Sequence, residues 1–460
     1  MKKNLLVIFF VSMFFVLDLF ADDFDLFDKM EETKMETLKE KTIFEKISEV
    51  ADFTLMFKYY HFLSDFTDST GEKDKRKDFA SVLFEPKLKY NYKNTIFNFR
   101  GWIESGNEKD TYKGYNKEFY DNSRHKRYFQ LAEINFIISL DNFELTLGKK
   151  DIKVGVATLY SPAERYKIIE GNDPVDLKEI GMWQIRGDYF KNDITYTFIF
   201  LPVFNESKVP SPYTRWSGEE DNSSTSTEFE GVKEDDIYKD IVNIRPENFS
   251  YLSKIKAVVK GWDIFATLYY GVSPYSVLRE DDNNSDKYYR EHPMILSTSS
   301  GFSTTYKKFE IHGETHLQYS PQGKDDTFIN YIVGSTYTLD EWVQYIWIDR
   351  IDATIEYAGE EIINDQYAKN YKRSSVDQRA GRNNILGRFN AKVNEKFNFE
   401  WYFTRNFDDK GFMHRYGAIY KFKSGITLKA FFDFFDGPKD SYFGKWRKND
   451  RFISFIEYKF

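Results

Sequence analysis

The chain has 460 residues, a net charge of −8 and no cysteine, which excludes disulfides, thiolate metal sites and cysteine nucleophiles. No block of Lys and Arg points to nucleic acid. The mean hydropathy of −0.60 is strongly polar, yet aromatic residues reach 19%, more than a disordered chain or an ordinary soluble α/β enzyme carries. A polar average with many aromatics is typical of a membrane β-barrel, which has a wet lumen and aromatic girdles facing lipid.

The first 21 residues have the features of a secretory signal peptide. Lys2 and Lys3 precede an apolar run over residues 5–17, and Ala21 precedes Asp22 at a plausible cleavage point. The apolar run is shorter than a membrane-spanning helix, although an uncleaved anchor is the alternative. No later segment approaches 18 consecutive apolar residues, so we expect no transmembrane helix.

Residues 22–50 alternate acidic and basic side chains, with Leu26, Met30 and Leu38 at loosely helical spacing. We expect a short charged N-terminal helical segment or tether on the periplasmic side. A plug inside the lumen is the alternative.

From residue 51 to residue 460 the hydrophobic period becomes two. Phe397, Phe399 and Trp401 alternate with the polar Asn398 and Glu400, and similar alternation recurs along the chain. Such runs predict strands with one apolar and one polar face. Because strands in lipid cannot leave backbone groups unpaired, the sheet must close on itself. A soluble protein of several β-sheets is the alternative, and it would need a dry core between its sheets.

Short turns alternate with long polar loops, which is the pattern of an outer-membrane barrel. We predict an all-β, antiparallel, up-and-down barrel of about 18 strands, with tight turns that include one near Leu339-Asp340. Sixteen strands is the alternative, because residues 290–308 and 329–350 are ambiguous. The last strand, 452–460, should pair with the first near residues 53–63 and turn its even-numbered residues to lipid.

The loop 151–181 carries many charges and is the best functional candidate. In many porins one loop folds inward and narrows the pore, and its charges then set selectivity. An ordinary exterior loop is the alternative. The candidates for the constriction are Arg165, Lys167, Glu170, Asp173, Asp176, Arg186 and Asp188.

Further polar residues fall on the faces predicted to line the lumen. They are Arg100, Glu104, Glu133, Glu310, His312, Glu314, His316, Arg388 and Glu400. The alternating acids and histidines of 310–316 could converge on a metal ion, but a water-facing wall predicts the same pattern. None of the six histidines lies in a motif that ties it to a nucleophile. We therefore expect no catalytic residues, no metal and no cofactor.

Two regions carry a family resemblance. They are Leu147-Gly148-Lys149-Lys150 with Gly155, 173–177 and 199–210, and the ending 435–460. They resemble an uncharacterised porin-like barrel family of Gram-negative bacteria, similar in outline to the alginate-export channel. The resemblance implies a barrel architecture, and no binding residues are carried over from it. Val154 stands where the family pattern has a tryptophan.

Together these features predict an outer-membrane channel for passive diffusion of small solutes through a water-filled lumen. The expected partners are membrane lipid, lipopolysaccharide and small solutes, with a homotrimer as one arrangement and nucleic acid excluded. The alternatives are a non-conducting barrel that acts as an adhesin or structural surface protein, and an export channel for a polymer or a hydrophobic compound.

Overall fold

The computed structural model describes residues 49–66, 73–108, 111–119, 125–208, 210, 213–217, 237–239, 242, 244–282 and 284–460. The chain divides into two compact units, Met1–Glu49 and Val50–Phe460, and the description below concerns the second. The signal peptide predicted for 1–21 and the helix or tether predicted for 22–50 fall outside the described residues, apart from Glu49 and Val50.

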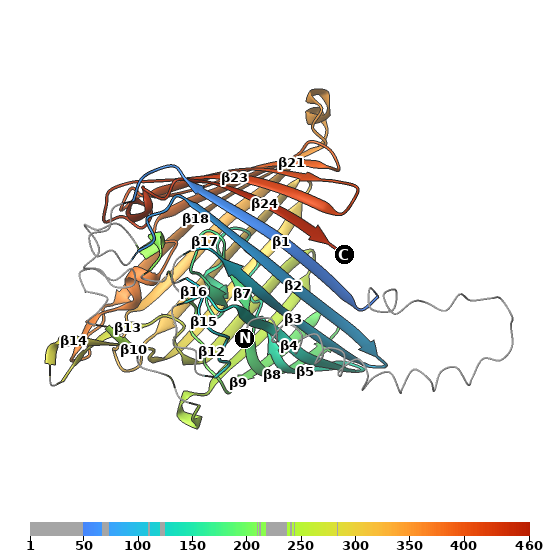
Figure 1. Ribbon diagram of the computed structural model, residues 1–460. Helices are drawn as coiled ribbons and strands as arrows, with labels where there is room; N and C mark the ends of the chain where they lie inside the picture. Colours follow the sequence, from blue (N-terminus) through green and yellow to red (C-terminus); the bar gives the residue numbers. More distant parts are fainter. Residues whose placement is uncertain are drawn as a thin grey trace, which may run out of the picture. The chain divides into compact units, whose positions relative to one another are not determined.

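Eighteen strands form one closed antiparallel sheet (Figure 1). They are β1 (Ala51–Phe62), β2 (Asp78–Tyr92), β3 (Thr95–Gly106), β4 (Phe129–Leu140), β5 (Phe143–Lys150), β8 (Met182–Lys191), β9 (Ile194–Leu201), β11 (Ser250–Val259), β12 (Trp262–Val272), β15 (Met294–Tyr306), β16 (Phe309–Tyr319), β17 (Thr327–Leu339), β18 (Arg350–Asn364), β20 (Asn384–Lys392), β21 (Phe397–Asn406), β22 (Phe412–Lys421), β23 (Ile426–Asp436) and β24 (Arg451–Lys459). Each strand pairs with the next along the chain. The predicted all-β barrel of 18 strands is confirmed.

The barrel closes between β24 and β1. Thr54 pairs with Lys459 and Phe62 with Arg451, so the two strands are in antiparallel register over almost their whole length. At the end of the seam the backbone N–H groups of Phe53 and Phe460 each donate to the other residue's carbonyl, at 2.9 and 3.0 Å. The predicted pairing of the last strand with the first is therefore confirmed, and no edge is left to aggregate.

The two faces of each strand differ as the sequence period predicts. In β24 the odd-numbered Arg451 and Ile453 are buried inside the barrel, whereas the even-numbered Ile456 and Tyr458 are exposed outside it. Large exposed hydrophobic residues recur on the outward face of most strands. The wall is thus apolar outside and polar inside.

One end of the barrel carries short turns and the other carries long loops. Two-residue turns join β2 to β3, β4 to β5, β8 to β9, β11 to β12 and β15 to β16. Their first residues include Lys93, Asp141 and Asn192, all with positive φ, which is the geometry of tight hairpins. Both β1 and β24 reach this short-turn end, where the chain enters and leaves the barrel.

The tight turn predicted near Leu339-Asp340 is wrong. β17 and β18 are joined by ten residues, 340–349, which contain the 3-10 helix η6 (Trp342–Ile346). The apolar run 342–348, interrupted only by Gln344, is not distinguishable from a continuation of the strands by its composition.

The long loops carry smaller elements. A four-stranded sheet is made by β10 (Ile237–Lys239), β14 (Asn284–Glu291), β13 (Val277–Asp281) and β19 (Tyr371–Arg373), and a two-stranded ribbon by β6 (Ile168–Glu170) and β7 (Lys178–Ile180). The remaining 3-10 turns are η1 (Pro162–Glu164), η2 (Arg215–Ser217), η5 (Pro246–Asn248), η7 (Ser375–Gln378) and η8 (Gly444–Trp446). Within the described residues, no helix has the length and apolar character needed to cross a membrane.

Candidate functional site: the loop that crosses the barrel

The connection between β5 and β8, residues 151–181, reaches the opposite wall of the barrel. There its backbone meets two carboxylates on the inward faces of β16 and β18. The N–H of Ala157 donates to Glu314 Oε1 at 2.6 Å, and those of Thr158 and Leu159 donate to Glu356 Oε1 at 2.8 and 3.0 Å. Because each acceptor is charged, these hydrogen bonds are stronger than bonds between neutral groups.

Both carboxylates are buried and have further partners. Ser161 Oγ donates to Glu314 Oε2 at 2.6 Å, and His312 Nε2 lies 2.9 Å from Glu356 Oε1. Gly155 makes the close approach possible, because a Cβ there would lie 2.0 Å from Ser161 Oγ and 2.6 Å from Glu314 Oε1. The first half of the loop is therefore fixed to the far wall through groups that are 150 or more residues apart in sequence.

The second half of the loop is held to β1 and β24 by ion pairs. Asp173 accepts from both terminal nitrogens of Arg451, and Arg451 Nε also donates to Asp433 Oδ2 at 2.8 Å. Asp176 accepts from Lys58 Nζ at 2.7 Å. Burial would raise the pKa of Asp176, but the Lys58 charge lowers that pKa well below its usual range. The loop therefore spans the barrel between two sets of buried charges.

Replacing Arg451 by methionine should destabilise the barrel by about 3–5 kcal/mol, because it leaves the buried Asp173 without its cation, whereas Asp433 keeps its ion pair with Arg415. The free energy of unfolding can be measured by urea titration of the protein in lipid vesicles, followed by tryptophan fluorescence. Lys459→Met is the matched control, since that cation lies on the same strand but is mostly exposed. An equal loss of unfolding free energy in both variants would contradict the stabilising role of Arg451.

The constriction candidates take different positions. Arg165 is almost fully buried, stacked between the rings of Tyr275 and Phe328 at 4.3 and 4.9 Å. Lys167 lies 2.7 Å from Glu179.

Three more candidates lie apart from these two. Glu170 is buried and accepts from Asn172. Arg186 and Asp188, on β8, pair with each other at 2.7 Å rather than with the loop. Thus the loop's most buried charges, Asp173 among them, hold it in place, and whether any candidate sets selectivity stays a prediction.

The polar residues predicted to face the lumen lie on inward faces. Arg100 pairs with Glu133 at 3.3 Å, and Glu104 binds Lys178 of the loop. His316 Nδ1 lies 2.8 Å from a serine hydroxyl on β15.

The other predicted lumen residues have fewer partners. Glu310 and Glu400 are half-buried. Arg388 Nε is buried with no hydrogen-bond partner among the described residues. In the part of the chain that the structure describes, no three His, Asp or Glu side chains gather in a way that could hold a metal ion.

A cavity of about 410 Å³ lies between the loop and the wall formed by β20, β21 and β22. On the loop side it is lined by Leu159, Tyr160, Pro174, Val175 and Leu177. On the wall side it is lined by Arg382, Asn384, Leu386, Tyr402, Thr404, Asn406, Met413 and Arg415. A second cavity of about 560 Å³ lies on the side of the long loops and includes Arg165 and Lys167. The sequence prediction missed the apolar loop residues because it considered only charged ones.

Two cations, Arg388 and Lys392, lie on the inward face of β20, whose even-numbered residues point inward. Arg382 lies in the loop just before this strand and lines the cavity of about 410 Å³. Among the described residues no carboxylate lies within ion-pair distance of any of the three; Glu400 on β21 is likewise without an ion pair. Unpaired cations therefore outnumber the unpaired carboxylate Glu400 in this part of the barrel.

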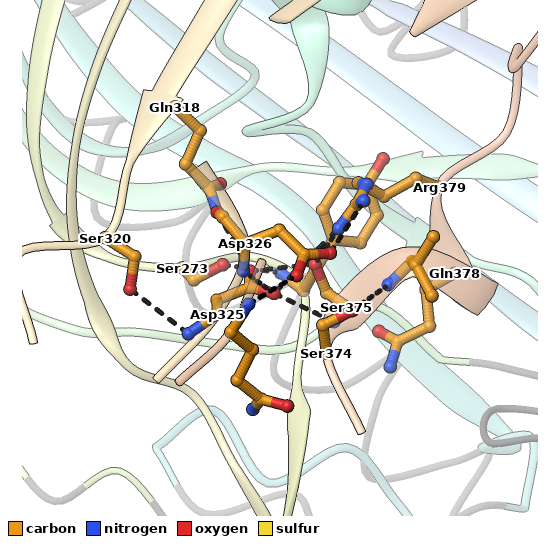
Figure 2. Close-up of polar contacts among 12 residues, drawn as sticks. Ser273, Gln318, Ser320, Asp325, Asp326, Ser374, Ser375, Gln378 and Arg379 are labelled. Atoms are coloured by element: carbon orange, nitrogen blue, oxygen red, sulfur yellow. Dashed lines mark hydrogen bonds and ion pairs between the residues drawn. The ribbon is translucent and has the colours of Figure 1, made fainter. Parts of the chain in front are cut away.

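A buried polar cluster fixes the long loop between β18 and β20 (Figure 2). Arg379 donates to Glu360 at 2.8–2.9 Å and to Asp326 Oδ2 at 3.0 Å, and its guanidinium lies 4.0 Å over the ring of Phe328. Burial alone would lower the Arg379 pKa, but Glu360 and the aspartates raise it above its usual value. Ser375 Oγ donates to Asp325 Oδ2 at 2.8 Å, which ties the same loop to residues 320–326.

Replacing Arg379 by methionine should loosen the loop 365–383, because Glu360 and Asp326 would be left buried without a cation. Trypsin should then cleave after Lys369, Lys372 or Arg373 at a rate about tenfold higher or more, since cleavage requires local opening. Fragments identified by mass spectrometry measure this rate. Lys410→Met, which removes an exposed loop cation, should leave the rate unchanged.

Comparisons with known proteins return structures only. No protein-family model and no curated protein matches the chain. Among solved structures, OccK9 (OpdG) of Pseudomonas aeruginosa aligns over 89% of this chain and 98% of its own, with 8% identity and a TM-score of 0.48. OccAB4 of Acinetobacter baumannii gives the same coverage, 9% identity and a TM-score of 0.46. A loop-deleted OmpT, an outer membrane protein of Vibrio cholerae, covers 89% and 99% at 9% identity and a TM-score of 0.36. Because these TM-scores are below 0.5, the fold is assigned from the strand pairing described above and not from these similarities.

Proposed function

We propose that this chain is an outer-membrane channel through which small solutes diffuse passively, narrowed by the loop 151–181. The observation that carries the proposal is the cavity of about 410 Å³ between that loop and the β20–β22 wall. It lies inside a closed barrel, beside a loop that spans the lumen. Nothing in this proposal requires a reaction, a metal or a cofactor.

The surface of the barrel supports the membrane location. Its outward face is apolar and its inward face polar, which is the reverse of a soluble protein. Membrane lipid would contact the outward face, and lipopolysaccharide would do so at the end with long loops. In a homotrimer, part of the same outward face would contact the neighbouring subunits.

The contacts of the loop support the narrowing. Its first half is bound to Glu314 and Glu356, and its second half to Lys58 and Arg451. Solutes must then pass beside the loop rather than through the full width of the barrel. Arg382 beside the cavity and Arg388 on β20, neither of which has an ion pair among the described residues, favour anionic solutes on this route.

Single-channel recording in planar lipid bilayers tests the proposal. The protein should give discrete conductance steps, and deletion of residues 155–178 should enlarge them. Absence of steps from folded protein, verified by its resistance to unfolding in detergent at room temperature, would overturn it. Unchanged steps after the deletion would leave a channel but refute the constriction.

A non-conducting surface barrel is the second candidate. It is favoured by the rigid joining of the long loops, in which β13 pairs with both β14 and β19. Long loops joined in this way would present a fixed surface to a partner.

An export channel for a polymer or a hydrophobic compound would conduct ions as well. Measuring the flux of such compounds from vesicles would distinguish it from a channel for small solutes.

A further inference from the structure

The connection between β17 and β18 differs from every other connection at the short-turn end of the barrel. The other connections at this end have two to four residues, whereas this one has ten and contains η6. Figure 1 shows the segment as a hook that projects beyond the neighbouring turns. We name residues 340–349 the aromatic hook.

The tip of the hook is apolar and exposed. Tyr345 and Trp347 are each 88% exposed, and Trp342 and Ile346 are more than half exposed. The run 342–348 contains no charged residue. A water-soluble surface seldom places so many large apolar side chains together, and such a patch marks a contact with a partner or a membrane.

The base of the hook is charged and holds the tip in one shape. Lys308, on the adjacent turn, pairs with Asp340 at 2.5 Å and with Glu341 at 2.7 Å. The N–H of Trp347 donates to the carbonyl of Gln344 at 3.1 Å. Trp347 has φ of +59°, a left-handed conformation that is unfavourable for a residue with a Cβ. The hook is therefore a built structure and not a loose connection.

The hook continues the outward apolar surface of the barrel. At its base the rings of Phe309 and Tyr337 lie 4.4 Å apart at an angle of 36°, and further along β17 and β18 Val333 and Ile355 are exposed on the outer face. Tryptophan and tyrosine, rather than leucine, dominate the tip. These two residues favour the boundary between lipid headgroups and hydrocarbon, because each has an apolar ring and one polar hydrogen-bonding group.

We propose that the aromatic hook is a lipid anchor, which inserts Trp342, Tyr345 and Trp347 into the headgroup boundary of the leaflet around the short-turn end. The binding partner of the hook is thus a phospholipid surface. The inference rests on the proposed membrane location of the barrel and adds to it a fixed depth and orientation at this end.

The absence of cysteine allows a direct test with one nitroxide label per chain. The full protein carrying Tyr345→Cys is reconstituted in vesicles of phosphatidylethanolamine and phosphatidylglycerol, and collisions of the label with oxygen and with a water-soluble nickel chelate are measured. Ile355→Cys is the control for lipid and Lys423→Cys, on another turn of the same end, is the control for water. The label at position 345 should resemble the lipid control more than the water control.

Three outcomes would overturn the inference. A label at position 345 that matches the one at position 423 places the hook in water. Dipolar broadening between labels indicates a second copy of the chain as the occupant. An unchanged depth after Trp342→Ser and Trp347→Ser shows that the indole rings do not hold the hook in lipid. If the label at position 355 is also in water, the membrane location fails instead, so the two proposals are distinguishable.

Discussion

Replacing Glu314 and Glu356 together by alanine is expected to raise the single-channel conductance about twofold or more. The two carboxylates accept the backbone N–H groups of the loop from Val156 to Tyr160. Each charged hydrogen bond contributes about 1.5–3 kcal/mol. Without them the first half of the loop should leave the wall and widen the passage. Planar bilayer recordings in concentrated potassium chloride measure the change.

Two further variants make this result specific. Glutamine at both positions should give a smaller rise, because the amide oxygen still accepts a backbone N–H. Alanine at Glu361 and Glu395 removes two exposed carboxylates that contact no loop, and conductance should stay at the value of the unaltered protein. A conductance of the Glu314 and Glu356 double variant equal to this control would refute the anchoring role.

Reversing the charge of Arg382 and Arg388 should invert the ionic preference of the channel. Arg382 lies in the loop before β20 and lines the cavity of about 410 Å³, and Arg388 lies on the inward face of β20; among the described residues neither has an ion pair. Glutamate at both positions turns an attraction for anions into an attraction for cations in a narrow, low-dielectric passage. The permeability ratio of chloride to potassium, read from the reversal potential in a salt gradient, should fall about tenfold.

The matched control reverses loop cations that do not line the cavity. Arg245→Glu and Lys410→Glu change the net charge of the protein by the same amount, but both side chains lie outside the barrel wall. Their reversal potential should stay close to that of the unaltered protein. An equal shift in both pairs would show that overall charge, and not the β20 wall, sets the preference.

Much of the fold was predictable because a membrane wall imposes a simple local rule. Each strand must alternate apolar and polar residues, so runs such as Phe397 to Phe403 identify strands without knowledge of their neighbours. Closure then follows from the need to pair every backbone group. The same rule failed at residues 340–349, where the apolar residues between Trp342 and Trp347 belong to the hook and not to a strand.

The candidate site was predictable only in part. The long charged segment 151–181 indicated an inward loop by its composition. The groups that hold it, Glu314 and Glu356, lie on strands far along the sequence, and local patterns carry no information on which strands face each other across a lumen. The roles of Leu159 and Val175 beside the cavity were not foreseen, because the prediction considered only the charged residues of the loop.

The seam between β1 and β24 has a consequence for folding. Its paired residues are separated by about 400 positions along the chain, so the contact that completes the sheet is also the most distant in sequence. Contacts of such separation form late and slowly, because the entropy of a very long loop must be lost first. Until they form, β1 and β24 each expose a row of unpaired backbone groups. The final seam should therefore be the rate-limiting step of assembly, and the stage at which the chain is most prone to pair with a foreign strand.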